Sequence, residues 1–137
     1  MQNLFVNPED EFVVYVSVAT NKDGAIFCDL NEESLRSSLE GFADVKECEI
    51  KTYKIVFKKP SFGDTVSLYD EIFSVNNDSV SFNPLQTRYK KIAALIKSWD
   101  FDGEDKKPTE SQIQKLHPVV ANAIGIQVDF ETGGVLS

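Results

Sequence analysis

The sequence predicts an α+β fold, with a small antiparallel N-terminal sheet and one helix followed by a C-terminal helical portion. Residues 1–60 are dominated by Val-rich and aromatic segments of strand composition, whereas residues 61–125 carry apolar side chains at helical spacing. The length of 137 residues, with 42% hydrophobic and 26% charged residues, suits one globular domain. We therefore expect a single α+β domain over residues 1–130 and a mobile tail over residues 131–137.

A hairpin and a short helix are expected first. Residues 12–20 are dense in Val and predict a strand. A turn over residues 21–24, which ends in an Asp-Gly pair, leads into a returning strand over residues 25–30. Asn31 is a favourable N-cap for a helix over residues 32–39, whose first turn is acidic.

A long third strand is expected over residues 45–57. Its apolar residues fall on two opposite parities, with Cys48 and Ile50 on one and Tyr53, Ile55 and Phe57 on the other. Successive side chains of a strand point to opposite faces, so a bulge or bend near residues 51–52 would bring both halves onto one buried face.

The strongest helical signal lies at residues 83–100. Asn83 is a favourable N-cap, and Pro84 suits the first helical position. Apolar residues recur along the segment at helical spacing, namely Leu85, Tyr89, Ile92, Ile96 and Trp99. This stripe predicts one amphipathic helix whose default role is core packing. Because Trp is also frequent among interface anchors, the candidate partner-binding residues are Tyr89, Ile92, Ile96 and Trp99.

Three further helices are expected around this segment. Apolar residues at helical spacing predict the first over residues 61–73. Thr109 and Gln112 have the spacing of a capping box and predict the start of the second. The third is a short helix over residues 118–124 that begins with proline and is expected to end at Gly125.

The acidic charge argues against binding to nucleic acid. The formal net charge is −8 and the isoelectric point is near 4.6, so a phosphate backbone would be repelled. No apolar run approaches the roughly 20 residues that span a bilayer, and the polar, acidic start lacks the features of a secretory signal. We expect a cytoplasmic protein that stays soluble while it offers an apolar surface to a partner.

No group of residues predicts catalysis, cofactor binding or metal binding. Cys28 and Cys48 lie in different predicted strands, so we expect buried free thiols, with a disulfide between adjacent strands as the alternative. His117 precedes Pro118 and is expected to have a structural role at a helix end. The acidic segment of residues 100–105 lacks the glycine and glutamate positions of a calcium-binding EF-hand loop. We therefore expect a protein that is not an enzyme.

The C-terminal half contains a succession of short motifs. It reads Leu95-Ile96-Lys97-Ser98-Trp99-Asp100, an acidic loop with glycine, Pro108-Thr109-Glu110, and Leu116-His117-Pro118-Val119-Val120-Ala121-Asn122-Ala123-Ile124. Over roughly residues 55–125 this succession resembles the tail assembly chaperones of long-tailed bacteriophages. Trp99, Asp100, Leu116 and Pro118 match the pattern of that family, in which these positions look structural.

The resemblance implies a binding protein without catalysis. Chaperones of this family bind the long, mostly helical tape measure protein and keep it soluble in the host cytoplasm until the tail tube polymerises around it. The expected partners are the tape measure protein or other phage tail proteins, with a homo-oligomer as a further option. The alternative is a structural virion protein, such as a small tail, neck or baseplate subunit. A third class, a small enzyme or regulatory adaptor, would need a convergent polar pocket that the sequence does not indicate.

Overall fold

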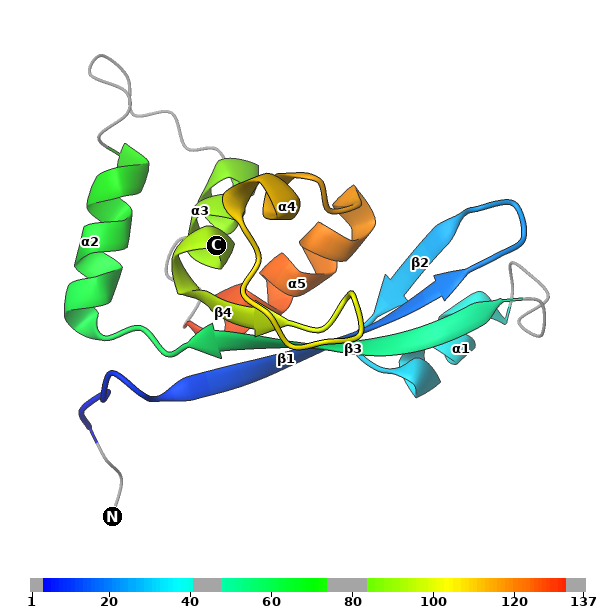
Figure 1. Ribbon diagram of the computed structural model, residues 1–137, viewed down its shortest axis with the longest axis horizontal. Helices are drawn as coiled ribbons and strands as arrows, with labels where there is room; N and C mark the ends of the chain where they lie inside the picture. Colours follow the sequence, from blue (N-terminus) through cyan, green and yellow to red (C-terminus); the bar gives the residue numbers. More distant parts are fainter. Residues whose placement is uncertain (1–3, 41–47, 74–83, 133–137) are drawn as a thin grey trace.

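A computed structural model describes residues 4–40, 48–73 and 84–132 of the chain (Figure 1). Four antiparallel strands form one sheet in the order β2-β1-β3-β4, and five helices surround it. The strands are β1 (Glu11–Thr20), β2 (Ile26–Asp29), β3 (Glu49–Lys58) and β4 (Ile96–Trp99). The helices are α1 (Glu32–Leu39), α2 (Phe62–Phe73), α3 (Pro84–Leu95), α4 (Glu110–Gln114) and α5 (Pro118–Glu131). The predicted α+β class, with most helices in the C-terminal part, is confirmed.

The local signals of the N-terminal part are confirmed. The β1–β2 hairpin forms across a turn in which Gly24 has a positive φ of 85°, a conformation that favours glycine. Asn31 caps α1, because its side-chain oxygen accepts a hydrogen bond from the backbone N–H of Ser34 at 2.8 Å. The glycine that follows α1 lies outside the described residues, as does the first part of the expected third strand.

The bulge expected near residues 51–52 does not form. β1 and β3 pair without interruption from Glu11 opposite Lys58 to Thr20 opposite Glu49. The apolar side chains of β3 instead point into two cores on opposite faces of the sheet, with Ile55 and Phe57 in one and Ile50 in the other. The predicted bulge was wrong because both faces of this strand are buried, each in a different core.

The larger core lies on the sheet face that packs against α3 and α5. Its strand residues are Val14 and Val16 of β1 and Ile55 and Phe57 of β3, all of them buried. The smaller core lies on the other face at the far end of the sheet, where α1 covers Ala19 and Ile50. Figure 1 shows this division, with α1 at one end of the sheet and the C-terminal helices gathered toward the other.

The segment expected as one helix over residues 83–100 divides into α3 and the edge strand β4. Trp99 pairs with Ile55 and Ile96 pairs with Phe57, and a register shift between these pairs leaves Lys97 as the extra residue. In a regular strand, side chains three residues apart point to opposite faces. The extra residue brings Ile96 and Trp99 onto the same side, and both are buried. Their spacing therefore imitates that of a helix. The expected cap Asn83 lies outside the described residues.

Both cysteines are free, as predicted, but they are half-buried where full burial was expected. Cys28 lies opposite Val18 in the hairpin and packs against the larger core. Cys48 packs against the smaller core. The two thiols therefore belong to different faces of the sheet.

Replacement of Trp99 tests how the larger core is held. The side chain is 5% exposed, its ring meets that of Phe101 edge-on at 4.9 Å, and its indole nitrogen has no acceptor among the described residues. Trp99→Ala should lower the free energy of unfolding by about 3–5 kcal/mol. Trp99→Phe should lower the free energy of unfolding clearly less, because phenylalanine keeps an aromatic ring and no hydrogen bond of the indole is lost. Urea unfolding followed by circular dichroism measures both variants, and equal losses would contradict this account.

Candidate functional site

The four residues predicted to bind a partner lie mainly in the protein's own core. Ile92, Ile96 and Trp99 are buried, and Tyr89 is half-buried with its hydroxyl accepting a hydrogen bond from the side-chain amide of Gln114 at 3.1 Å. Their apolar side chains stabilise the packing of α3 and β4, so the structure assigns these four residues to packing. Tyr89 and Ile92 also line a pocket between α3, α4 and α5.

α5 is about twice as long as the sequence analysis predicted. His117 caps its start by accepting a hydrogen bond from the backbone N–H of Val119 at 3.2 Å, which confirms the structural role expected for this histidine. The helix then continues through Gly125 to Glu131, so residue 131 belongs to a helix and not to the expected tail. Residues 133–137 of that tail lie outside the described residues.

Gly125 lies inside α5 at a point where the helix packs closely against α3. A side chain at this position would have little room. A Cβ atom at Gly125 would lie 3.0 Å from Cδ of Arg88 and 3.4 Å from its Cβ. The backbone of α5 therefore approaches α3 more closely than alanine would allow without movement of Arg88. Glycine was read as a helix stop, whereas here it permits helix packing.

Apolar side chains cover two opposite sides of α5. Val120, Ile124 and Val128 face the larger core and are buried. On the other side Val119 is 42% exposed, Ile126 is 49% exposed and Phe130 is 84% exposed. These three residues lie at positions i, i+7 and i+11, which form one stripe along a helix. We call this stripe the outer face of α5, and none of its three side chains is charged.

Pockets open on both sides of this stripe. A pocket of about 450 Å³ lies between α3, α4 and α5, with Leu85, Tyr89, Leu116 and Pro118 among its apolar walls. A second pocket of about 390 Å³ lies between β2 and α5. Asn122 lines both pockets. The outer face of α5 together with the two pockets is the candidate functional site.

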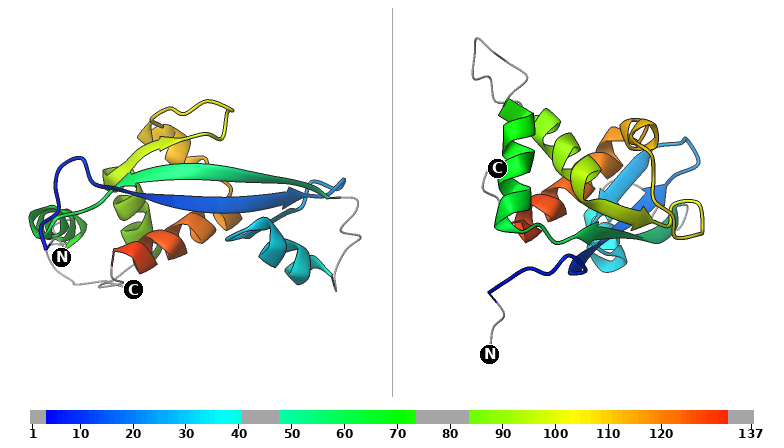
Figure 2. Two further views of the ribbon diagram at one scale, coloured as in Figure 1. Left: turned by 90° about the horizontal axis from the view of Figure 1, so that it is seen from below. Right: turned by 60° about the vertical axis from the view of Figure 1, so that its left-hand side comes forward.

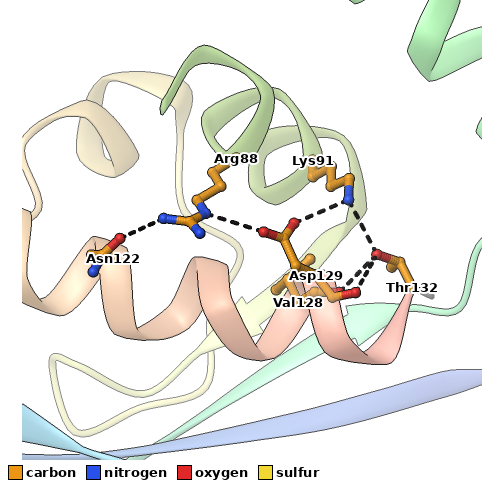
Figure 3. A network of polar contacts seen from close by, with 6 residues as sticks. All are labelled: Arg88, Lys91, Asn122, Val128, Asp129 and Thr132. Atoms are coloured by element: carbon orange, nitrogen blue, oxygen red, sulfur yellow. Dashed lines mark hydrogen bonds and ion pairs between the residues drawn. The ribbon is translucent and has the colours of Figure 1, made fainter. Parts of the chain in front are cut away.

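A polar network fixes α5 against α3 (Figure 3). Lys91 of α3, whose side chain is 3% exposed, places its ammonium nitrogen 3.0 Å from Oδ1 of Asp129. Arg88 places Nε 3.1 Å from Oδ2 of the same carboxylate and donates to Oδ1 of Asn122 at 2.7 Å. The hydroxyl of Thr132 lies 3.4 Å from the Lys91 nitrogen. One carboxylate thus compensates two cations, one of which is buried.

A further contact ties α5 to the sheet. The side-chain amide of Gln127 donates a hydrogen bond to the backbone oxygen of Tyr15 in β1 at 2.6 Å. Figure 2 shows α5 lying alongside the strands of the sheet. The helix is therefore held by the core, by α3 and by β1, and this leaves its outer face directed away from the protein.

The side chains of Cys28 and Tyr69 have a raised pKa. Burial, with a smaller effect from the nearby carboxylate of Asp29, raises the pKa of the Cys28 thiol to about 11. The thiol is therefore protonated and a poor nucleophile at neutral pH. Burial, with a smaller effect of Asp129, also raises the pKa of Tyr69 in α2.

Within residues 4–40, 48–73 and 84–132, no group of three or more His, Cys, Asp or Glu side chains is placed to hold a metal ion. In the same residues, no helix has both the length and the apolar character needed to cross a bilayer.

The charge network can be tested by removing either side of the buried pair. Asp129→Asn should lower the free energy of unfolding by about 3–5 kcal/mol, because it leaves the buried Lys91 ammonium without a counter-charge. Lys91→Met should lower the free energy of unfolding by about 1 kcal/mol less than Asp129→Asn does, because Asp129 keeps its contact with Arg88. Urea unfolding at neutral pH measures both losses. A larger loss for Lys91→Met would show that the carboxylate is not the shared partner.

The close approach at Gly125 can be tested against a second helical glycine. Gly63→Ala in α2 should stabilise the protein by about 0.5–1 kcal/mol, because the new methyl group would meet only Oγ of Ser61 at 3.8 Å. Gly125→Ala gains the same helix propensity but crowds Arg88, so it should give no net gain or a loss. Thermal and urea unfolding compare the two. Equal stabilisation by both variants would contradict the packing role of Gly125.

Comparisons with known proteins identify no relative of this chain: no family model, no curated protein and no solved structure matches it significantly.

Proposed function

We propose that this protein is a tail assembly chaperone of a long-tailed bacteriophage that acts in the host cytoplasm. Its role would be to bind the tape measure protein and keep it soluble while the tail assembles. The observation that supports this proposal is the outer face of α5, an uncharged apolar stripe that the rest of the described chain leaves exposed. The motif resemblance over residues 55–125 supports the same function.

The physical chemistry of the surface fits a helical ligand. Contiguous apolar surface on a soluble protein marks an interaction site more often than chance exposure does. An amphipathic helix binds such a surface by laying its own apolar face into the groove. Full burial of one side chain of the size of Ile126 or Phe130 contributes about 1.5–3 kcal/mol, before the cost of ordering the partner. The net charge of −8 would keep the complex soluble.

The composition of the site supports binding without catalysis. The walls of the pocket between α3, α4 and α5 are mainly aliphatic and aromatic, with amide side chains from Gln86, Gln114 and Asn122. Its arginine, Arg88, is engaged by Asp129 and Asn122, so that cation stabilises the packing of α3 on α5. We therefore propose a binding protein that is not an enzyme.

The first experiment is co-expression of this chain with the tape measure protein encoded beside it, followed by purification through a tag on this chain. The tape measure protein should become soluble and co-elute. If it stays insoluble while this chain appears in finished phage particles, the protein is a structural virion component and the proposal is wrong.

A pair of phenylalanine variants tests the surface. Phe130 in α5 is 84% exposed, and Phe62 at the start of α2 is 86% exposed, so the second is a matched control for the first. Phe130→Ser should weaken capture of the tape measure protein about tenfold, because it removes an apolar anchor from the proposed interface. Phe62→Ser should leave capture unchanged. The readout is the amount of co-eluting protein at equal expression, and equal effects would remove α5 as the binding surface.

A further inference from the structure

β2 is an edge strand of the sheet (Figure 1). Within residues 4–40, 48–73 and 84–132 it pairs with β1 alone. The opposite edge of the sheet differs, because there Trp99 of β4 exchanges two backbone hydrogen bonds with Lys106, both at 3.0 Å. The chain thus closes part of the β4 edge itself, whereas the outer side of β2 has no strand partner in the described ranges.

The hydrogen bonds of the hairpin show which backbone groups of β2 point outward. In an antiparallel pair, opposite residues alternate between those that exchange hydrogen bonds and those that do not. Asn21 donates to the backbone oxygen of Ala25 at 3.1 Å, in register with the pairs of β1 and β2. The alternation then directs the backbone groups of Phe27 toward β1 and those of Ile26 and Cys28 away from it.

The pairing between β1 and β3 leads to the same assignment. Lys59 donates a backbone hydrogen bond to Asp10 at 2.9 Å, in the register that continues along both strands. The even-numbered residues of β1 therefore bond to β3, and its odd-numbered residues bond to β2. These lie opposite the odd-numbered residues of β2, so the N–H and C=O groups of Ile26 and Cys28 form the open edge.

A pocket lies beside this edge, on the face of the sheet that packs against α5. It is the pocket of about 390 Å³ described above, which Cys28 lines together with Val119, Ala123 and Ile126 of α5. Directly opposite residues of two paired strands point to the same face of a sheet. A residue opposite Cys28 in an added strand would therefore direct its side chain toward this pocket. Because these four walls are apolar, an aliphatic side chain suits that position.

The other face of the same edge carries a carboxylate. Asp29 lies opposite Ser17, on the face that α1 covers, and its Oδ2 accepts a hydrogen bond from the hydroxyl of Ser38 in α1 at 3.3 Å. In the three described ranges, no Lys or Arg nitrogen forms an ion pair with it. A Lys or Arg opposite Asp29 in an added strand would supply that charge, and cross-strand pairs of opposite charge stabilise a sheet.

We infer that the open edge of β2 binds an extended segment of another protein as an additional antiparallel strand. The segment would exchange backbone hydrogen bonds with Cys28, place an aliphatic side chain in the pocket beside it, and place a Lys or Arg opposite Asp29. Strand addition of this kind draws affinity from the main chain and specificity from alternate side chains. The inference goes beyond the proposed function, because this ligand is extended and binds through its backbone, whereas the ligand proposed above is helical.

A second copy of this chain fits the edge less well. Two-fold pairing about the middle of β2 would place Ile26 or Cys28 of one copy opposite Cys28 of the other. Both side chains already pack against the larger core of their own copy, so neither would be free to fill the neighbouring pocket. Each copy would also bring a further net charge of −8. A foreign strand with a free aliphatic side chain and a positive charge fits the edge better.

The test uses a fluorescent synthetic peptide in which Thr and Lys alternate and the central Thr is replaced by Leu. In an extended peptide the Leu lies on one face and all Lys side chains lie on the other. Methylation of the Leu nitrogen removes the donor to Cys28 and should weaken binding to the full chain at least about fivefold in fluorescence anisotropy. Methylation of the next Lys nitrogen, which points away from β2, keeps the same charge and should leave binding unchanged.

Two further comparisons test the side chains. A peptide with Thr in place of Leu should bind about tenfold more weakly, because it leaves the pocket unfilled. The protein variant Asp29→Asn should bind the Leu peptide about threefold more weakly, since it removes a partly exposed charge. Asp23→Asn, in the exposed turn of the same hairpin, changes the net charge equally and should have little effect.

Amide hydrogen exchange locates the added strand. In the free protein the amides of Ile26 and Cys28 should exchange faster than that of Phe27, and bound Leu peptide should slow both. Equal binding of the two methylated peptides, or no protection of these amides, would overturn the inference. Protection of both amides in the free protein would also overturn it, in a monomer because the chain covers its own edge and in a dimer because a second copy does. Each of these outcomes is independent of the capture experiment with Phe130.

Discussion

The packing of α5 against both the sheet and α3 positions every part of the candidate site. The helix is apolar on nearly all sides, and such a helix is normally buried all round. Here the sheet covers one side and α3 covers another, with Gly125 allowing the close approach and Asp129 holding two cations of α3. Since these contacts use only part of its circumference, the remaining apolar side forms a surface without a partner in the described chain.

The residues of α5 that stabilise the fold differ from those that form its exposed outer face. The residues that hold α5 are buried or engaged in the polar network, whereas Val119, Ile126 and Phe130 contribute little to the core. Phe130 is 84% exposed, so its replacement should have little effect on folding. Loss of Asp129, in contrast, would leave Lys91 buried without a counter-charge.

The sequence predicted the elements that depend on local signals and missed those that depend on tertiary contacts. The hairpin, α1 with its cap Asn31, and the capping box at α4 were all predicted correctly, because each is encoded within a few residues. β4 was missed because the extra residue Lys97 gives a strand the spacing of a helix. The site was missed because Gly125 was read as a stop, and only its contact with Arg88 shows why the helix continues. The apolar residues Ile126, Val128 and Phe130, which follow Gly125 at helical spacing, were the available signal that the helix continues.

The geometry of α5 also constrains the sequence of the helix that would bind it. Asn122 lines the pocket between β2 and α5, and Phe130 lies eight residues further along the helix, or about 12 Å at 1.5 Å per residue. A partner helix aligned with α5 covers that distance in about two turns. It should therefore place two apolar anchors seven or eight residues apart, because that spacing puts both on one face at the required separation. A helix with this pattern would contact the pocket and Phe130 together, whereas one with a shorter spacing would reach only one of the two.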